Sequence, residues 1–391
     1  MKTPAAVAAL HLRAMALFDD YLNLKGFRRA LWLARLRRDE LPELTAAVNA
    51  LVAADRDTDG RLEHGVPDFT LSTVRAGEMT GMLGRRLGQW HIDSPIGHGG
   101  SGAIYLAHRV DECPEHPCAL KVVQLDLDGA RTQERFREGQ KQLAHLIHPN
   151  IAALLDGGTE DGTLPWFAME LVRGEPIDVY CAREKLSVRS RVTLMMKVAD
   201  ALCYAHNRLV VHRDIKPSNL LVTADGQVKL LDLGISALLA ECVVPEHRPA
   251  NHGARPRFAA PEQFSGGSVT TGIDIYAFGL LLHLLLCGRH AFGRATLAIS
   301  YMDHTAPRYA PGQMLRAAQG MRREEAATWS SSPRTLARSL KGDLDAVVAR
   351  CLQADPADRY ATAAALKDDL AAWLDVHPVM GWLGWGTLRR H

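Results

Sequence analysis

The stretch that decides the fold is Val211-His212-Arg213-Asp214-Ile215-Lys216-Pro217-Ser218-Asn219-Leu220-Leu221-Val222. It sets an acid, a base and an amide at fixed spacing immediately before an apolar run. Two shorter motifs follow it along the chain, Asp232-Leu233-Gly234 and Ala260-Pro261-Glu262. Three separated motifs in this order are very unlikely to arise by chance, so they define one catalytic type of domain.

A glycine-rich run lies upstream of these motifs. It reads Ile96-Gly97-His98-Gly99-Gly100-Ser101-Gly102-Ala103-Ile104 and has the form G-x-G-x-x-G. Glycines at these positions let backbone amides approach phosphate oxygens without a Cβ in the way. By itself the run also suits a dinucleotide-binding turn. The residues from Ile104 to Ala107 continue as a strand, however, and no helix opens at the third glycine, which excludes that alternative.

One lysine stands in the apolar run Cys118-Ala119-Leu120-Lys121-Val122-Val123. If Lys121 is buried, it needs a compensating anion, which phosphate oxygens and a helix carboxylate could provide. The alternative interpretation is a surface lysine on an edge strand. The motifs on either side favour the phosphate-binding interpretation.

Taken together, these motifs resemble the protein kinase family, and specifically the bacterial eukaryotic-like (Hanks-type) serine/threonine kinases. The resemblance covers about 87–374. It implies an α+β, two-lobed fold with a small β-rich N-lobe carrying one main helix and a mainly helical C-lobe. It also implies ATP and Mg²⁺ as cofactors and Ser/Thr hydroxyls of proteins as acceptors. Further matches are His148-Pro149-Asn150-Ile151, Asp274-Ile275-Tyr276-Ala277-Phe278-Gly279 and Asp358-Arg359-Tyr360.

The resemblance also implies a role for each polar residue. Asp214 orients the attacking hydroxyl and accepts its proton, and Lys216 neutralises the negative charge of the phosphoryl group during transfer. Asn219 and Asp232 offer the hard oxygen ligands that magnesium prefers. Lys121 clamps the α- and β-phosphates.

The hinge between the lobes is expected at Met169-Glu170-Leu171-Val172, with Met169 as gatekeeper. Ile104, Ala119 and Leu221 would form an apolar slot for adenine, although the same residues are equally compatible with ordinary core. Glu262 and Arg359 are expected to brace the substrate loop by a charge-assisted hydrogen bond. The expected nucleotide-binding residues are Ile96, Gly97, Gly99, Gly102, Ile104, Ala119, Lys121, Met169, Glu170, Val172 and Leu221.

The helix carboxylate that should pair with Lys121 is ambiguous. The text Arg137-Glu138-Gly139-Gln140 favours Glu138, whereas counting back from His148 puts Gly139 at the expected position. Glu138 can then pair with Lys121 only if the helix carries a one-residue bulge. Glu138 is therefore the candidate, and without such a bulge we expect weak activity.

The loop between Asp232 and Glu262 also departs from the family pattern. Ser236 is its only hydroxyl-bearing residue, so we expect no dependence on loop phosphorylation. Arg213 must then meet another anion, with Glu241 or Glu246 as candidates. The loop carries Arg255 where a threonine normally braces the catalytic aspartate and lysine. These departures motivate an alternative function, a pseudokinase or scaffold that binds nucleotide with weak or no turnover.

Composition and patterning set the remaining expectations. The chain has 391 residues with a formal net charge of +2, so nucleic acid is not implied as a partner. Its seven cysteines lack disulfide spacing, and its most apolar stretch, 275–287, is shorter than the roughly 20 residues of a membrane span. We therefore expect a cytoplasmic protein without a transmembrane segment.

Helical spacing near the N-terminus predicts a short helical module, either an accessory bundle or a docking or regulatory element for a partner. The expected domains are this module at 1–65, a linker at 66–86, a kinase domain at 87–376 with an N-lobe at about 87–170 and a C-lobe at about 173–376, and a tail at 377–391.

Overall fold

The computed structural model of the chain describes residues 32, 36, 44, 45, 81–99, 102–111, 117–123, 130–160, 164–242, 257–265, 269–292 and 308–376. The chain divides into two compact units, Met1–Thr70 with Phe292–Pro307, and Leu71–Ala291 with Arg308–His391. In the first unit, the Thr45 hydroxyl donates to the carbonyl of Leu36 at 3.4 Å. The rest of the expected helical module, the linker up to residue 80 and the tail lie outside the described residues, so the expected domain boundaries stay predictions.

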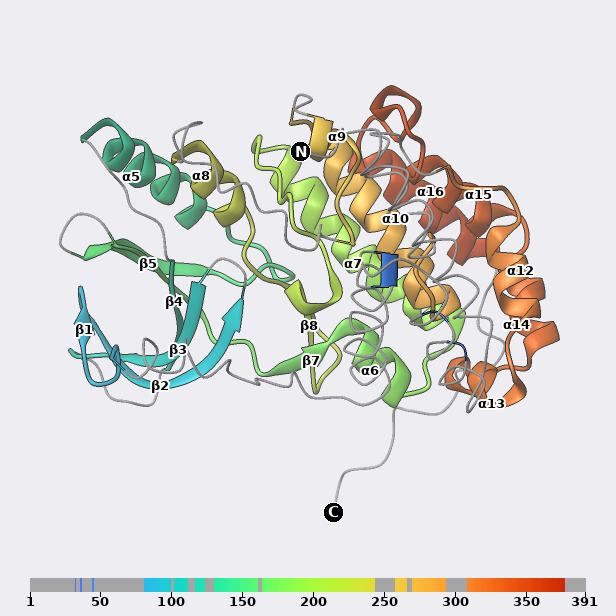
Figure 1. The fold of residues 1–391 in the computed structure, drawn as a ribbon, viewed down its shortest axis with the longest axis horizontal. Helices are drawn as coiled ribbons and strands as arrows, with labels where there is room; N and C mark the ends of the chain where they lie inside the picture. The colour runs from blue at the N-terminus through green and yellow to red at the C-terminus, as the bar shows by residue number, and fades with distance from the viewer. Residues whose placement is uncertain are drawn as a thin grey trace, which may run out of the picture. The chain divides into compact units, whose positions relative to one another are not determined.

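An antiparallel sheet forms the N-lobe, in the strand order β1-β2-β3-β4-β6-β5. Figure 1 shows it on the left, with α5 and α8 along one side. Since neighbouring strands alternate in direction, tight connections suffice for most of the pairings. The strands are β1 (Arg86–Leu87), β2 (Trp90–Gly99), β3 (Gly102–Arg109), β4 (Cys118–Val122), β5 (Leu154–Glu160) and β6 (Leu164–Glu170).

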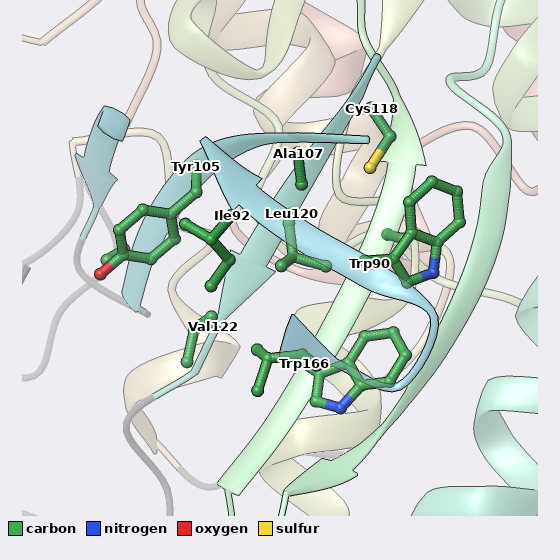
Figure 2. Packing of buried hydrophobic residues seen from close by; sticks show 11 residues of the cluster. Trp90, Ile92, Tyr105, Ala107, Cys118, Leu120, Val122 and Trp166 are labelled. Atoms are coloured by element: carbon green, nitrogen blue, oxygen red, sulfur yellow. The ribbon is translucent and has the colours of Figure 1, made fainter. Parts of the chain in front are cut away.

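One face of this sheet carries a hydrophobic core. Alternate residues of each strand point to the same face, so residues 103, 105 and 107 of β3 pack with residues 118, 120 and 122 of β4. Figure 2 shows the indoles of Trp90 and Trp166 closing one side of this cluster while Tyr105 lies at the other. This core fixes the register, because a slip of one residue would turn every apolar side chain to the wrong face.

The opposite face of the sheet carries the residues that the sequence assigns to the nucleotide. In the β3·β4·β6 register, Ile104 lies opposite Lys121 and Lys121 opposite Phe167. Phe167 in turn contacts Phe136 of helix α5 (Ala130–Ala144), with ring centroids 5.4 Å apart. The helix therefore covers the face from which the Lys121 side chain projects.

The C-lobe follows and is mainly helical. Its centre is α10 (Gly272–Cys287), in which all residues but Leu284 are buried, as expected for a helix apolar all round. A small sheet, β7 (Gly174–Pro176), β8 (Leu220–Thr223) and β9 (Val228–Leu230), lies at the edge nearest the N-lobe in Figure 1. The other helices are α6 (Ile177–Arg183), α7 (Val188–His206), α8 (Ile235–Cys242), α9 (Glu262–Ser265), α12 (Gln313–Gln319), α13 (Arg323–Ala326), α14 (Pro333–Ser339), α15 (Asp343–Cys351) and α16 (Ala363–Val376).

The expected α+β fold is confirmed: a β-rich lobe with one main helix precedes a mainly helical lobe. Among the helices of the described part, none has both the length and the apolar character of a membrane span.

Candidate active site

Lys121 projects from the middle of β4 and is only 3% exposed. Its Nζ lies 2.6 Å from Oδ2 of Asp232, the first residue of the Asp-Leu-Gly motif. Asp232 follows β9 and adopts a left-handed backbone, with φ of 57°. Because an unpaired buried ammonium is costly, this ion pair offsets the cost of burying Lys121.

A second polar cluster forms around Asp214. Lys216 Nζ lies 2.7 Å from Asp214 Oδ2. The Asn219 amide donates to both Oδ2 and the backbone carbonyl of Asp214, at 3.0 and 2.8 Å. Asp214, Lys216 and Asn219 are thus held together as one unit.

Two hydrogen bonds join this cluster to the strand that carries Asp232. The Leu231 amide donates to the Asn219 carbonyl at 2.8 Å, and the Leu231 carbonyl accepts from Nε2 of His212 at 2.8 Å. Leu231 directly precedes Asp232. The loop around Asp214 and the residue paired with Lys121 are therefore positioned together.

His212 is buried and forms hydrogen bonds through both ring nitrogens. Its Nε2 donates to the Leu231 carbonyl, so its Nδ1 is free to accept the Asp214 amide, 3.2 Å away. An imidazolium has no acceptor nitrogen and could not make both bonds. The tautomer follows from these two partners.

Asp274 of helix α10 fixes the backbone of the loop that carries Asp214. Its carboxylate is fully buried in α10 and accepts from the amides of His212 and Arg213, at 2.8 and 2.9 Å, and from His206 Nε2 at 2.8 Å. Arg213 has a left-handed φ of 68°, which costs energy for any residue but glycine. The two amide bonds hold that conformation.

Glu262 and Arg359 form the ion pair that the sequence predicts. Arg359 donates from Nη1 and Nη2 to the two carboxylate oxygens, at 2.6 and 2.9 Å. The same guanidinium donates to the carbonyls of Gly272 and Gln353 and lies over the ring of Tyr276. This two-pronged geometry fixes α9 against the start of α10.

The glycine-rich run forms the hairpin between β2 and β3. Gly97 pairs with Ile104 and Gly99 with Gly102 in that register, while Gly100 and Ser101 lie outside the described residues. Gly102 has a φ of 145°, and a Cβ there would lie 2.0 Å from the Val122 carbonyl oxygen. The third glycine thus has a packing reason of its own, independent of any ligand.

The residues expected to form the adenine slot lie on several strands and in the connection after β6. Ala119 lies beside Leu106 and Met169 in the register, on the same face as Ile104. Met169 is buried and lines a small pocket together with Asp232 and Leu143. Ile96 is half-buried on β2, Leu221 lies half-buried on β8, and Val172 lies in the connection after β6.

Glu170 ends β6 and joins it to the neighbouring segments. Its carboxylate lies 2.8 Å from Lys229 Nζ on β9 and accepts the Ala153 amide at 3.2 Å. Its own amide donates to the Ala153 carbonyl at 2.9 Å. Glu170 therefore holds the strand leading to Asp232.

The structure does not pair Glu138 with Lys121, which corrects the sequence-based assignment. Helix α5 is regular from Ala130 to Ala144, and Glu138 lies on its exposed face. One residue on an α-helix is a rotation of about 100°, so without a bulge the inward position belongs to Gly139. The anion that Lys121 contacts is Asp232.

Gly139 is the point at which the segment after Asp232 packs on α5. A Cβ at Gly139 would lie 2.2 Å from Cδ1 of Leu238, which is buried on α8. Figure 1 shows α8 running beside α5. Ser236 belongs to α8, whereas the region of Glu246 and Arg255 lies outside the described residues.

The donor set fits a magnesium ion that shares its ligands with phosphate. With its amide nitrogen donating to Asp214, Asn219 keeps Oδ1 without a partner among the described residues, and Asp232 supplies a carboxylate. No group of three or more His, Cys, Asp or Glu within that part of the chain could hold a metal by itself. Magnesium sites of this type use one or two protein oxygens plus substrate phosphates.

Sequence reasoning missed the roles of Asp274 and Gln263. An aspartate in the most apolar helix of the chain signals buried donors nearby, and the three donors of Asp274 meet that expectation. Gln263 bridges two loops that are far apart in the sequence. Nothing in the residues around Gln263 indicates this contact.

Comparison with known proteins agrees with this geometry. Residues 90–371 match the family model described as "Protein kinase domain". The chain is 30% identical over 302 residues to a probable serine/threonine-protein kinase of Streptomyces coelicolor, covering 75% of this chain and 41% of that protein. It is 29% identical to serine/threonine-protein kinase PrkC of Bacillus subtilis (75% and 42% covered) and to PknB of Mycobacterium tuberculosis (72% and 42%).

The chain spans about two fifths of the length of these relatives. The family match itself covers well over half of the chain and includes every element that carries the two polar clusters. The chain belongs to the protein kinase domain family.

Proposed function

We propose that this protein transfers the γ-phosphate of ATP to serine or threonine hydroxyls of protein substrates, using Mg²⁺. The observation that carries the proposal is the Lys121–Asp232 ion pair, joined through Leu231 to the loop that presents Asp214. Such an arrangement collects a cation for phosphate, oxygen ligands for a metal and a proton acceptor, which are the groups that phosphoryl transfer needs.

The chemistry divides among these side chains. Asp214 accepts the proton of the attacking hydroxyl, and Lys216, 2.7 Å from it, neutralises charge on the phosphoryl group. Asp232 and the Oδ1 of Asn219 hold the metal, which supplies charge neutralisation on the phosphates. Lys121 exchanges part of its contact with Asp232 for phosphate oxygens, because both groups are then compensated by opposite charge.

The nucleotide base is proposed to lie against the sheet face opposite the tryptophan core. Ile104, Ala119 and Met169 share that face by register, and Leu221 faces it from β8 in this proposal. Glu170 and Val172 offer backbone groups, and Ile96, Gly97, Gly99 and Gly102 form the hairpin above the phosphates.

Glu138 has no place in this proposal as a partner of Lys121. Lys121 pairs with the carboxylate of Asp232 instead. Without a helix carboxylate as a second partner, we expect the Lys121 side chain to be less well ordered during turnover.

Protein hydroxyls are the proposed acceptors because Lys216 stands two residues after Asp214, a spacing that resembles serine/threonine kinases. The relatives named above are called serine/threonine-protein kinases, which supports the same class. The described cysteines are free thiols, which favours a reducing compartment, and we propose the cytoplasm. A docking partner for the N-terminal module is a further proposal that rests on its helical sequence pattern alone.

A transfer assay tests the function. Wild-type protein is incubated with γ-³²P-labelled ATP, Mg²⁺ and a peptide array, and its products are hydrolysed to identify the labelled amino acids. We expect label on serine or threonine, and a loss of about 10²- to 10⁴-fold in Asp214→Asn, which keeps shape but not basicity.

Asp225→Asn is the matched control, because Asp225 is an exposed carboxylate in the turn between β8 and β9, bonded to the Thr223 hydroxyl. It should transfer at the wild-type rate. Equal incorporation by wild type and Asp214→Asn would leave only a scaffold that binds nucleotide.

A further inference from the structure

Gln263 closes a short turn at the start of α9. The Ala260 amide donates to its side-chain Oε1 at 2.8 Å, and the Gln263 amide donates to the Ala260 carbonyl at 3.1 Å. An amide N–H can only donate to oxygen, so these contacts fix which end of the carboxamide faces Ala260. The nitrogen is left pointing the other way.

That nitrogen donates to the backbone carbonyl of Arg213 at 3.1 Å. The peptide group concerned joins Arg213 to Asp214, and its N–H donates to His212 Nδ1. Both ends of this one peptide group are therefore held by side chains. Because Arg213 has a strained, left-handed φ, the bond to its carbonyl adds a further restraint on this peptide group, beside the bond to His212.

The turn that carries Gln263 is itself rigid. Its neighbour Glu262 makes the two-pronged ion pair with the buried Arg359, and Ala260 is fully buried. A donor on a fixed turn loses little entropy when it bonds the loop, so its hydrogen bond positions Asp214 effectively.

We propose that Gln263 is a positioning residue for the phosphoryl transfer, acting through the Arg213 carbonyl to set the Asp214 carboxylate relative to the substrate loop. This inference rests on the function proposed above. It assigns to Gln263 an effect on the rate of transfer, separate from its part in folding.

The chain contains a matched control for this residue. Ala310-Pro311-Gly312-Gln313 repeats the pattern of Ala260-Pro261-Glu262-Gln263 at the start of α12. There too the alanine amide donates to the glutamine Oε1, at 3.3 Å, and the glutamine Nε2 donates to a distant carbonyl, that of Ala291. The second turn holds no residue of the site.

The test compares Gln263→Leu and Gln263→Glu with Gln313→Leu and Gln313→Glu in the full chain. Steady-state kinetics with labelled ATP, Mg²⁺ and an acceptor peptide chosen from the wild-type array separate kcat from KM. Gln263→Leu should lower kcat about fivefold, the worth of one hydrogen bond, with KM for ATP unchanged. Both Gln313 variants should retain the wild-type kcat.

The Gln263→Glu variant gives a signature that folding alone cannot. The new carboxylate still accepts from Ala260 but sets an anionic oxygen against the Arg213 carbonyl, so kcat should fall about tenfold or more at pH 8. Protonation of that carboxyl as the pH falls restores a donor toward the Arg213 carbonyl. The ratio of variant to wild-type kcat should therefore rise as pH falls.

The outcomes separate cleanly. Wild-type protein that transfers no phosphate overturns the proposed function and this inference with it. Active wild type with a kcat ratio for Gln263→Glu that is equal to one, or flat from pH 6 to pH 8, overturns the inference alone. If Gln263→Leu fails to fold, the Gln263→Glu ratio still decides, because that variant keeps the bond that closes the turn.

Discussion

Replacing Gly139 with alanine tests the packing of the segment after Asp232 on α5. The new Cβ would lie 2.2 Å from Cδ1, 3.1 Å from Cγ and 3.2 Å from Cδ2 of Leu238. Overpacking of this kind costs about 1–3 kcal/mol. Relative to glycine, alanine in the interior of α5 stabilises that helix by about 1 kcal/mol, but this gain does not stabilise α8.

Hydrogen exchange measures this effect on α8 itself. A loss of about 1–3 kcal/mol in local stability should speed exchange of the 235–242 amides about 5- to 150-fold, since 1.4 kcal/mol is a factor of ten. The exchange rates of α16, which does not contact this site, provide an internal reference.

Leu238→Ala completes a double-mutant cycle. In that background the clash is absent, so adding Gly139→Ala should leave α8 exchange nearly unchanged. Leu239→Ala, a buried neighbour on the same helix, is the control in which the full effect of Gly139→Ala should persist. Equal exchange of α8 in wild type and Gly139→Ala would refute the packing argument.

Two stability predictions concern buried ionisable side chains, Arg359 and His283. Arg359→Leu leaves the Glu262 carboxylate without its partner, so urea denaturation should show a loss of about 3–5 kcal/mol, and unchanged stability would contradict this. Burial lowers the pKa of His283 from 6.5 to about 4. Between these values the unfolded chain binds more protons, so stability falls as pH falls, by up to about 3 kcal/mol. His283→Leu should flatten that slope in denaturation series from pH 7 to pH 4.5; an unchanged slope would show that other groups produce it.

The motifs predicted the polar clusters because each cluster is built locally. Asp214, Lys216 and Asn219 lie within six residues, so their mutual hydrogen bonds follow from the loop that the motif specifies. Lys121 could be placed because it is the one charged residue in an apolar run and because recognisable motifs lie on either side of it. The two-lobed fold followed from the order of these motifs.

The partner of Lys121 was harder to predict, because a shift of one residue rotates a helical side chain by about 100°. The sequence supported two alternatives for the inward position of the helix. The residue types around Glu138 favoured Glu138, and the distance from His148 favoured Gly139. Which one points inward depends on how Phe136 and Leu143 pack, and both of these are buried.

The packing of helix α8 on α5 could not be predicted from its own sequence. Its packing depends on the space that Gly139 leaves on a helix about 100 residues earlier in the chain. The bond from Gln263 to Arg213 is likewise a contact between distant loops. Local patterns carry no information on either.

The central claim is that Lys121, Asp214, Asn219 and Asp232 surround the phosphate end of a nucleotide. A crystal structure with a non-hydrolysable ATP analogue and Mg²⁺ tests it directly. We expect phosphate oxygens on Lys121, the metal on Asp232 and Asn219, and the terminal phosphate facing Asp214. An analogue bound with its phosphates on any other surface would contradict it.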